Sequence, residues 1–500
     1  MSKNPVTKPV KKTVTLGAIP EEFIKIRGAD AVAIRYGDDL LTGGELEERS
    51  RRRAWFLKEQ GVNEGDWVTV ALPNGTDFFE VIFALWKLGA TPHVVSPRLP
   101  HRELSALVEL AQPKKIIASS DKIVEDFSAL PANFGRDHPC IDPVPEAISK
   151  PWKAMSSGGS TGRPKIIAQP SAATFDNSML QLPGMGAILT TGPLYHNMPV
   201  LTSVWSIYCG SQVVGMDRFD PEEALQLIER HKVSWAGFVP TMMNRIWQLP
   251  DDIRRRYDVS CLNIVYHYAA PMPPALKQHW IDWLGPKKIW ELYGATEGIG
   301  TTCLNGEAWL KHRGSVGRPV RDSLKIVDES GQSLPAGEVG EVFAKTPDGM
   351  MPSYYYVGSE ARKDAEGYES VGDFGWLDDE GYLYIADRRT DMIVCGGTNI
   401  FPAEIEGAMM AHPFVEEAVV IGLPHEDLGA AVHAIVKPSS EGEEQLDDEE
   451  LVTFLKDRLI RYKIPRTFEF TSQRLRDDAG KVRRKKLRED RIAAAKPDAD

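Results

Sequence analysis

The sequence predicts an α/β protein in which a large alternating region is followed by antiparallel β structure and a small α+β unit. In the first half, helical and strand-like segments alternate, which is typical of βαβ units and mostly parallel sheets. Over residues 325–393, short strand-like pieces are separated by Gly, Pro and Asp turns, which favours antiparallel pairing. From residue 402 onward, helices and strands are short and closely spaced, as in a compact α+β unit.

Hydrophobic spacing places the individual elements. In the first half we expect helices over 46–60, 77–88 and 221–231, and strands over 67–72, 91–95 and 233–239. In the C-terminal unit we expect helices over 402–411 and 446–459, and strands over 415–423 and 432–436. Pro402 suits the first turn of its helix, where its missing N–H costs nothing.

Composition and charge exclude several classes of protein. The chain has 500 residues, enough for roughly three domains. Its formal net charge of -12 argues against nucleic acid as the main partner, although a local basic patch for a phosphorylated cofactor is compatible with it. The five cysteines lie far apart and form no CxxC pair, so neither a zinc site nor a disulfide framework is expected.

The N-terminal segment and the hydrophobic runs predict a cytoplasmic protein. The first residues carry lysines but no apolar stretch and no small-residue cleavage site, so we expect a short disordered arm and not a signal peptide. No apolar run approaches the ~18–20 residues that a membrane span requires.

Residues 156–165, Ser-Ser-Gly-Gly-Ser-Thr-Gly-Arg-Pro-Lys, form the first chemical motif. Backbone N–H groups and hydroxyls in such a loop can surround phosphate oxygens, and Lys165 adds a cation. The spacing does not fit a Walker A loop. A flexible Gly/Ser linker is the alternative interpretation, although the Thr-Gly-Arg-Pro-Lys ending and the position within a domain favour a phosphate loop.

Four further segments carry candidate binding residues. In residues 290–298, Tyr293 can stack on a purine, and Glu297 can hold Mg²⁺, which takes few protein ligands. In 370–391, Asp373 can accept from ribose hydroxyls and Arg388 can donate to the ribose or a phosphate. A glycine turn at 396–397 leads into a helix, and a Gly-Lys turn at 480–481 leads into a basic run at 484–486, which we expect to be a solvated face.

These five segments, in this order, resemble the adenylate-forming superfamily, which includes acyl- and aryl-CoA synthetases, peptide-synthetase adenylation domains and firefly luciferase. The resemblance covers nearly the whole chain and takes in residues 41–46 and 87–90. It implies a large N-terminal domain of two β/α sheet subdomains plus a β-barrel, and a small mobile α+β C-terminal domain. It divides the chain into residues 1–389, which bind acid and ATP, and residues 390–500.

The resemblance also implies a role for each matching residue. The implied catalytic set is Lys481, which assists adenylation, His196 beside the acyl carboxylate, Thr161 and Glu297. Glu297 is the implied magnesium ligand. The implied cofactor-binding residues are Ser157, Gly158, Gly159, Ser160, Thr161, Gly162, Lys165, Tyr293, Gly294, Thr296, Asp373, Arg388, Gly396 and Gly397.

An acid–thiol ligase that uses ATP, Mg²⁺ and coenzyme A is the activity that these residues imply. A carboxylate attacks the α-phosphate of ATP, pyrophosphate leaves, and charge builds on phosphate oxygens near Lys481 and the loop amides. A thiolate then attacks the acyl carbonyl and AMP leaves. Since Lys481 lies on the small domain, that domain has to swing away before the thiol enters.

The acid is expected to be apolar and bulky, with polycyclic acids included because the motifs are similar to those of bacterial bile-acid-type CoA ligases. The expected pocket residues are Tyr195, His196, Phe238, Tyr268, Ala269 and Met272. Trp205 and Met242 fit the pocket and the core equally well.

Two positions depart from the superfamily pattern. The hinge is Thr390 where Asp or Lys is common, and Tyr268 replaces a small residue in a turn near the nucleotide. An enzyme that performs only thioesterification of an acyl-adenylate, or transfer to a carrier protein, is therefore kept as the alternative. A non-catalytic nucleotide-binding module is disfavoured by the presence together of Lys165, Glu297, Asp373, Arg388 and Lys481. A homodimer is left open.

Overall fold

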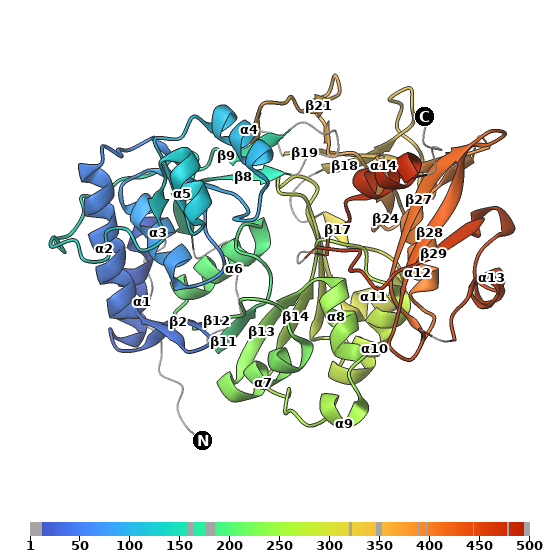
Figure 1. Ribbon diagram of the computed structural model, residues 1–500, viewed down its shortest axis with the longest axis horizontal. Coiled ribbons are helices and arrows are strands. Elements are labelled where there is room, and N and C mark those ends of the chain that lie inside the picture. Colours follow the sequence, from blue (N-terminus) through green and yellow to red (C-terminus); the bar gives the residue numbers. More distant parts are fainter. Residues whose placement is uncertain are drawn as a thin grey trace.

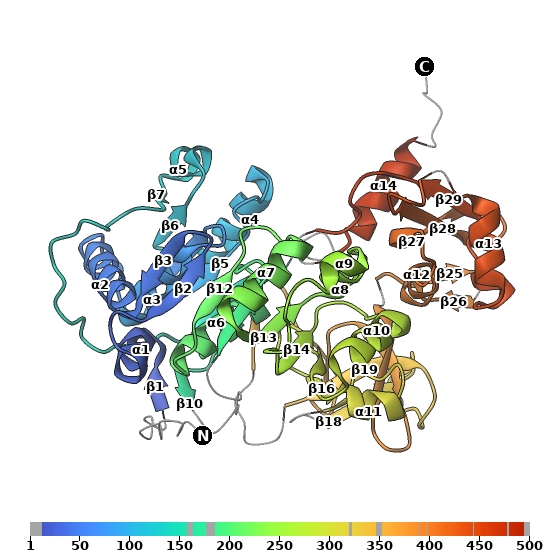
Figure 2. The ribbon, with the colours of Figure 1, turned by 90° about the horizontal axis from the view of Figure 1, so that it is seen from below.

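The computed structural model describes residues 13–157, 164–176, 186–319, 323–346, 353–388, 390–396, 398–443, 445–477 and 480–494. It consists of a large N-terminal domain and a small C-terminal domain, which lies at the right of Figure 1. Figure 2 shows the same two parts from below. None of the helices within these ranges has the length and apolar character that crossing a membrane requires.

The first sheet of the large domain has seven strands in the order β20-β9-β8-β5-β4-β6-β7. Its central strands pair in parallel, whereas β9 and β20 are antiparallel at one edge. The strands are β4 (Trp67–Ala71), β5 (Thr91–Val94), β6 (Lys115–Ala118), β7 (Leu130–Pro131), β8 (Lys153–Ser157), β9 (Lys165–Gln169) and β20 (Tyr355–Val357). The helices of this region are α1 (Ile19–Arg27), α2 (Gly43–Glu59), α3 (Thr76–Lys87), α4 (His101–Ala111) and α5 (Asp121–Phe127).

Local sequence explains where these helices begin and what they bury. Thr42 caps α2 by accepting from the Glu45 N–H, and the Glu45 carboxylate accepts from the Thr42 N–H, which forms a capping box. Almost every residue of α3 is buried, because this helix lies inside the domain. The predicted elements over 46–60, 67–72, 77–88 and 91–95 are confirmed, with small shifts at their ends.

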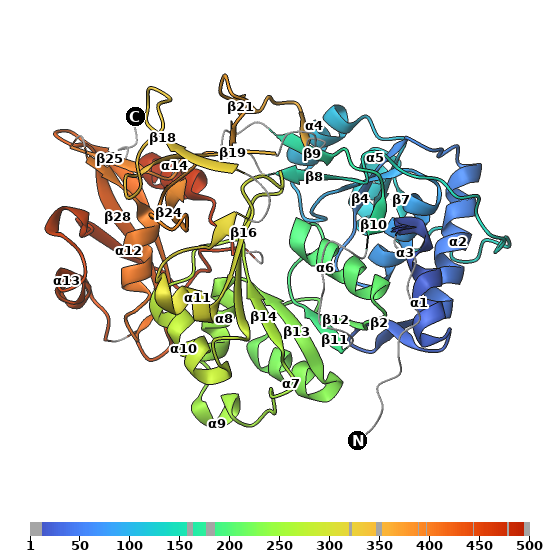
Figure 3. The ribbon, with the colours of Figure 1, turned by 180° about the vertical axis from the view of Figure 1, so that it is seen from behind.

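The second sheet has nine strands in the order β17-β16-β15-β14-β13-β11-β12-β2-β3. They are β2 (Val32–Tyr36), β3 (Asp39–Thr42), β11 (Ala187–Thr190), β12 (Val213–Gly215), β13 (Val233–Phe238), β14 (Ile264–His267), β15 (Ile289–Tyr293), β16 (Thr302–Asn305) and β17 (Arg318–Pro319). Its helices are α6 (Asn197–Tyr208), α7 (Pro221–His231), α8 (Pro240–Trp247), α9 (Asp251–Arg254), α10 (Pro274–Leu284) and α11 (Gly306–Lys311). From behind, α8, α10 and α11 lie between this sheet and the small domain (Figure 3).

An antiparallel sheet completes the large domain in the region where the sequence predicts β structure. Its strands are β18 (Ser323–Val327), β19 (Gly340–Lys345), β21 (Arg362–Lys363), β22 (Glu369–Ser370), β23 (Asp373–Leu377) and β24 (Leu383–Arg388). The register of β23 and β24 pairs Asp373 with Arg388. A separate two-stranded sheet joins β1 (Thr13–Thr15) to β10 (Thr174–Asp176).

The described part of the small domain contains a five-stranded sheet and three α-helices, and it is the α+β unit that the sequence predicts, with more elements than the two helices and two strands expected. Its elements are β25 (Ile393–Cys395), β26 (Thr398–Ile400), α12 (Pro402–Met409), β27 (Val415–His425), β28 (Gly429–Pro438), α13 (Asp448–Lys456), β29 (Thr467–Phe470) and α14 (Arg484–Ala494). One expectation for this domain is wrong, because Arg484 does not belong to a solvated face. Its guanidinium pairs with Asp391 and Glu406, each at 2.7 Å, and only 17% of its side chain is exposed.

Candidate active site

Glu297, after a strand of the second sheet, contacts Lys165 of the first sheet. Glu297 lies in the turn after β15, and Lys165 is the first residue of β9. The Lys165 Nζ is 3.4 Å from Glu297 Oε1, and it lies over the Tyr356 ring at 3.9 Å from the centroid. The Tyr356 hydroxyl donates to the same oxygen at 2.6 Å. The carboxylate is thus held in place by a cation and a hydroxyl from the other sheet.

The Glu297 carboxylate can hold a magnesium ion through one of its oxygens. Both of its side-chain contacts to described residues use Oε1, so Oε2 has no protein partner among them. Mg²⁺ usually keeps several waters and takes only one or two carboxylates beside substrate phosphates. Among the described residues, no group of three or more His, Cys, Asp and Glu side chains forms a richer metal site.

A second cluster joins Tyr293, Asp373 and Arg388. The Tyr293 hydroxyl donates to Asp373 Oδ2 at 2.6 Å, and Arg388 Nε donates to Asp373 Oδ1 at 3.1 Å. Burial and the neighbouring Asp373 carboxylate raise the pKa of Tyr293 well above its usual range. Each carboxylate oxygen can still accept another hydrogen bond, as a diol of ribose requires. The predicted purine-stacking ring and the predicted ribose acceptor are therefore adjacent.

The small domain brings Lys481 to these residues. Enclosure by protein and the nearby Arg388 lower the pKa of Lys481, while Asp477 and Glu297 act in the opposite direction. Lys481 nevertheless keeps an exposed surface, so it faces the space between the domains and is not part of a core. The preceding Gly480, at φ +73°, comes close to Val239 and Thr241 of the large domain, where a β-carbon would lie 3.3 Å from either side chain.

His196 lies at the N-terminus of α6 in the field of the same lysine. Burial and the Lys481 cation lower its pKa to about 3, so the ring is neutral. Its Nε2 is buried and has no hydrogen-bond partner among the described residues. A neutral ring nitrogen without a partner can donate to or accept from a bound ligand without adding charge.

Several predicted site residues cannot be located. Gly158, Gly159, Ser160, Thr161 and Gly162 lie outside the described residues, as does Gly397. Ser157 ends β8, which runs antiparallel to β9 and pairs Ser157 with Lys165. Gly396 is in the turn between β25 and β26, where its N–H donates to the Leu428 carbonyl.

The predicted acyl-pocket residues fall into two groups. Tyr195, His196, Ala269 and Met272 keep accessible surface, whereas Phe238 and Tyr268 are buried in the hydrophobic core of the second sheet. The same core contains Met242, and Trp205 is also buried, although both remained candidates for the pocket.

Tyr268 is accommodated by a glycine on the neighbouring strand. A β-carbon on Gly237 would lie only 2.9 Å from the Tyr268 hydroxyl, so the ring uses the space that Gly237 leaves free. The large side chain that replaces a small residue in this turn is therefore accommodated at the neighbouring strand.

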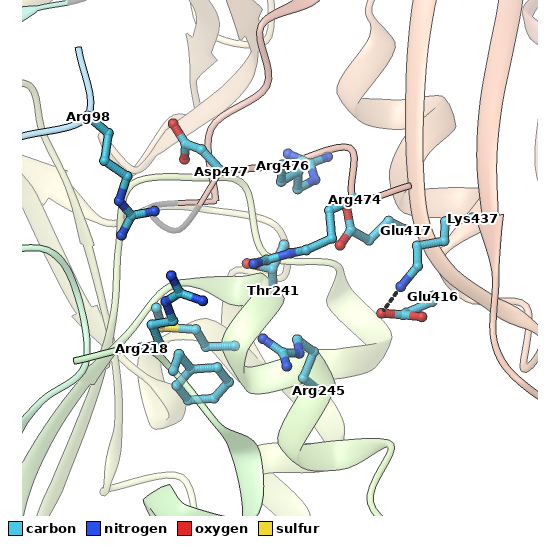
Figure 4. A pocket seen from close by; sticks show the side chains of 12 residues that line it. Arg98, Arg218, Thr241, Arg245, Glu416, Glu417, Lys437, Arg474, Arg476 and Asp477 are labelled. Atoms are coloured by element: carbon cyan, nitrogen blue, oxygen red, sulfur yellow. Dashed lines mark ion pairs between the residues drawn. The ribbon is translucent and has the colours of Figure 1, made fainter. Parts of the chain in front are cut away.

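A charged pocket of about 330 Å³ lies where the two domains meet (Figure 4). Helix α8 contributes one wall and the small domain the other, with Lys437 paired to Glu416 at 2.5 Å. The Asn244 side chain donates to the Glu416 carbonyl at 3.3 Å, which ties α8 to β27. The labelled lining residues are Arg98, Arg218, Thr241, Arg245, Glu416, Glu417, Lys437, Arg474, Arg476 and Asp477.

Sequence reasoning missed three residues that hold the site together. Tyr356 and Ser353 donate to the carboxylate and the backbone carbonyl of Glu297, and Gln169 donates to the Thr296 carbonyl at 2.9 Å. The run of three tyrosines at 354–356 was the available signal, but it is indistinguishable from ordinary strand composition.

Comparison with known proteins agrees with this geometry. The family model "AMP-binding enzyme" matches residues 22–355, and "AMP-binding enzyme C-terminal domain" matches residues 404–481. The chain belongs to the AMP-binding enzyme family. This membership confirms the predicted superfamily and the predicted α/β fold of a large and a small domain.

Two relatives and one solved enzyme illustrate the family. A 2-succinylbenzoate–CoA ligase from Bacillus licheniformis is 30% identical, covering 92% of this chain and 96% of that protein. A feruloyl-CoA synthase from Amycolatopsis is 30% identical, covering 92% and 95%. The o-succinylbenzoate CoA synthetase of Bacillus subtilis, in complex with its acyl-adenylate intermediate, aligns with a TM-score of 0.79 at 26% identity, covering 95% and 98%.

A second structure of the Bacillus subtilis enzyme, in complex with ATP and a magnesium ion, aligns with a TM-score of 0.78 at 26% identity, covering 95% of this chain and 99% of that one. The predictions of an acid–thiol ligase and of ATP, Mg²⁺ and coenzyme A are confirmed at the level of this family.

Proposed function

We propose that the protein is an AMP-forming acyl-CoA ligase that adenylates an apolar, bulky carboxylic acid and transfers the acyl group to coenzyme A. The observation that carries the proposal is that Lys481 of the small domain lies close enough to Glu297, Arg388 and His196 of the large domain for their charges and its own to shift pKa values. This arrangement places two cations, Lys481 and Arg388, and the neutral His196 where an acid and a nucleoside triphosphate would react.

In the first step, the acid carboxylate attacks the α-phosphorus of ATP, and the bond to pyrophosphate breaks. Lys481 donates to the phosphoryl oxygens on which negative charge grows, and Lys165 binds the phosphates that leave. His196 orients the attacking carboxylate through its neutral Nε2. When bound at Glu297, Mg²⁺ supplies further charge neutralisation at the phosphates.

In the second step, the thiolate of coenzyme A attacks the acyl carbonyl and AMP leaves. We propose a boundary between residues 1–389 and 390–500, with Thr390 as the hinge. Support comes from β24, which ends at Arg388, and from β25, which begins at Ile393 in the sheet of the small domain. Moving Lys481 away about this hinge opens the acyl carbonyl to the thiol.

The apolar acid is supported by the accessible Tyr195, Ala269 and Met272 and by relatives named for aromatic acids. The thioesterification-only alternative depended on two departures from the family pattern, Tyr268 and Thr390, and a hinge residue such as Thr390 need not be charged. Since Gly237 accommodates the Tyr268 ring, we favour the complete reaction. A cytoplasmic location is proposed with it, because ATP and coenzyme A are the substrates.

The test is release of AMP and pyrophosphate with ATP, Mg²⁺ and a panel of aliphatic, aromatic and polycyclic acids, with and without coenzyme A. AMP together with an acyl-CoA product supports the proposal and identifies the acid class. If no acid yields AMP but synthetic acyl-AMP plus coenzyme A gives thioester, only the second half-reaction is retained and the proposal is overturned.

A further inference from the structure

Lys153 is buried in the large domain without a carboxylate partner. It is the first residue of β8, the strand that leads into the segment 158–163, and only 1% of its surface is exposed. Its Nζ lies 4.2 Å from the centre of the Trp152 ring and donates to the side-chain oxygen of Asn197. Among the described residues it forms no ion pair.

Asn197 is the first residue of α6, directly after His196. Strand β8 lies in the first sheet, whereas α6 contacts β11 and β12 of the second sheet, so the Lys153–Asn197 hydrogen bond joins the two halves of the large domain at this point. His196 occupies the N-cap position but makes no side-chain capping bond. The start of α6 is attached to the first sheet through the Lys153–Asn197 hydrogen bond and, just before the helix, through the Leu194 N–H, which donates to the side chain of Asn74 after β4 at 2.8 Å.

Holding the Asn197 amide with a buried lysine is unfavourable in free energy. Removing an ammonium group from water is unfavourable unless a carboxylate compensates, and the positive end of a helix dipole adds to the cost. Burial lowers the pKa of Lys153 to about 7. An apolar residue of similar length would fit the core with less cost, as the neighbouring Ala154 and Met155 do.

We infer that Lys153 is a positioning residue of the adenylation site, which fixes Asn197 and thereby presents His196 to the carboxylate of the acid. The inference rests on the proposed function and deepens it. It explains why a charge is kept in a core where no described carboxylate pairs with it: the hydrogen bond from Lys153 to Asn197 sets the position of His196 relative to β8.

The other ionisable groups near Lys153 do not account for it. On the adjacent strand β5, His93 lies opposite Ala154, and its Nδ1 is hydrogen-bonded to the Thr69 hydroxyl. Burial lowers the pKa of His93 to about 3, so this ring is neutral. On β9, the residue opposite Lys153 is the uncharged Gln169. On the α6 side, His196 is also neutral.

Thermal stability and adenylation are expected to move in opposite directions in Lys153→Met. We expect a higher melting temperature together with at least about a tenfold lower kcat/KM for the acid, as loss of a charged hydrogen bond predicts. The KM for ATP should be unchanged. Lys277→Met is the matched control, since Lys277 is equally buried but paired with Glu291, and its melting temperature should fall.

The pH dependence separates the two roles further. Lys153 is charged below about pH 10.5 in the unfolded chain but only below about 7 in the folded one. The stability gained by Lys153→Met should therefore be greatest at or below pH 7 and shrink toward pH 10. In the wild type, the ammonium form donates more strongly, so kcat/KM for the acid should fall as pH rises through about 7, and the variant should lack this limb.

A double variant tests the route through Asn197. If Lys153 acts through that side chain, Asn197→Leu should lower kcat/KM for the acid as Lys153→Met does, and the double variant should be no worse than either. Additive losses would overturn the inference, as would a Lys153→Met enzyme whose kcat and KM for the acid equal those of the wild type. Circular dichroism checks that each variant is folded. If Lys153→Met does not fold, Lys153→Gln replaces it in the same measurements. Failure of the wild type to form AMP with any acid would instead contradict the proposed function.

Discussion

Lys153 and Lys277 are both almost completely buried in the large domain, but their partners differ. Lys277, on α10, pairs with the Glu291 carboxylate on β15, and His267 lies 3.7 Å from the same carboxylate. Lys153, on β8, donates to an amide oxygen and to no other described side chain. Burial lowers the pKa of both ammonium groups, and only for Lys277 does a carboxylate counteract it.

This difference separates a charge that serves the fold from one that serves the site. The Lys277–Glu291 pair is complete within the protein, and it anchors the strand that ends in Tyr293. The Lys153 charge has no such counterpart among the described residues. A buried ion pair is weak evidence for function because the two charges compensate each other. A buried ammonium without a carboxylate is not compensated, so its presence indicates a role other than core packing.

The largest effect is expected from breaking the satisfied pair. Lys277→Met leaves Glu291 as a buried charge without its partner, which should cost ~3–5 kcal/mol of folding free energy. Urea unfolding at pH 8 measures this loss. The matched control is the double variant Lys277→Met/Glu291→Leu, which removes both charges and should recover most of the stability. A single variant as stable as the wild type would show that the two lysines do not differ as described.

Lys481 extends the comparison to a lysine that is exposed between the domains. Lys481→Ala should lower acyl-AMP formation by ~10²–10³-fold, the usual loss when one donor to a developing anion is removed. Thioester formation from supplied acyl-AMP should be largely retained, because the lysine leaves before that step. Pyrophosphate and thioester assays measure the two steps separately.

The control for this variant is Lys485→Ala, in a side chain that is 62% exposed and only loosely paired with Glu489 at 3.9 Å. It should not affect adenylation. Equal loss of both half-reactions in Lys481→Ala would contradict the assigned role.

Asp373 offers a smaller effect, on nucleotide binding alone. Asp373→Asn keeps the shape of the side chain but removes the charge that pairs with Arg388 and accepts from Tyr293. A charged hydrogen bond contributes ~1.5–3 kcal/mol, so the KM for ATP should rise about 10- to 100-fold while the KM for the acid stays constant. Pyrophosphate release at varied ATP measures it. A change in the KM for the acid alone would mean that Asp373 does not hold the nucleotide.

Much of the fold can be predicted from hydrophobic periodicity, but the burial of single lysines cannot. The helices around α2 and α3 and the strands between them could be placed from the sequence because their apolar spacing is regular. Lys153 lies within a short apolar strand, where a single lysine has no pattern that marks its burial. Arg484 was misplaced for the reverse reason, because a run of basic residues indicates solvent, whereas its partners Asp391 and Glu406 are distant in sequence.

The candidate site could be assembled from motifs but not completed from them. Recognisable segments contain Lys165, Tyr293, Glu297, Asp373 and Lys481. The structure pairs Lys165 with Glu297 and Tyr293 with Asp373, and Lys481 of the small domain lies close enough to act electrostatically with Glu297. The supporting residues lie outside any motif, because they act through single hydrogen bonds across the junction of the sheets. Such contacts depend on the three-dimensional pairing of β9 with β20, which no local pattern reveals.

The smallest predicted effect concerns Tyr268 and Gly237, a pair that compensates a departure from the family pattern. In Gly237→Ala the new β-carbon would meet the Tyr268 hydroxyl at 2.9 Å, so the ring has to shift, at a cost of ~1–3 kcal/mol. Thermal unfolding measures the cost, and Gly237→Ala/Tyr268→Phe should recover part of it because the hydroxyl is gone. The relative activities toward the acids of the panel should change when the ring shifts. The KM for ATP should not change, because Tyr268 packs against Gly237 of β13. A rise in the KM for ATP would mean that the ring does reach the nucleotide, and that Gly237 relieves less of the crowding than its missing side chain implies.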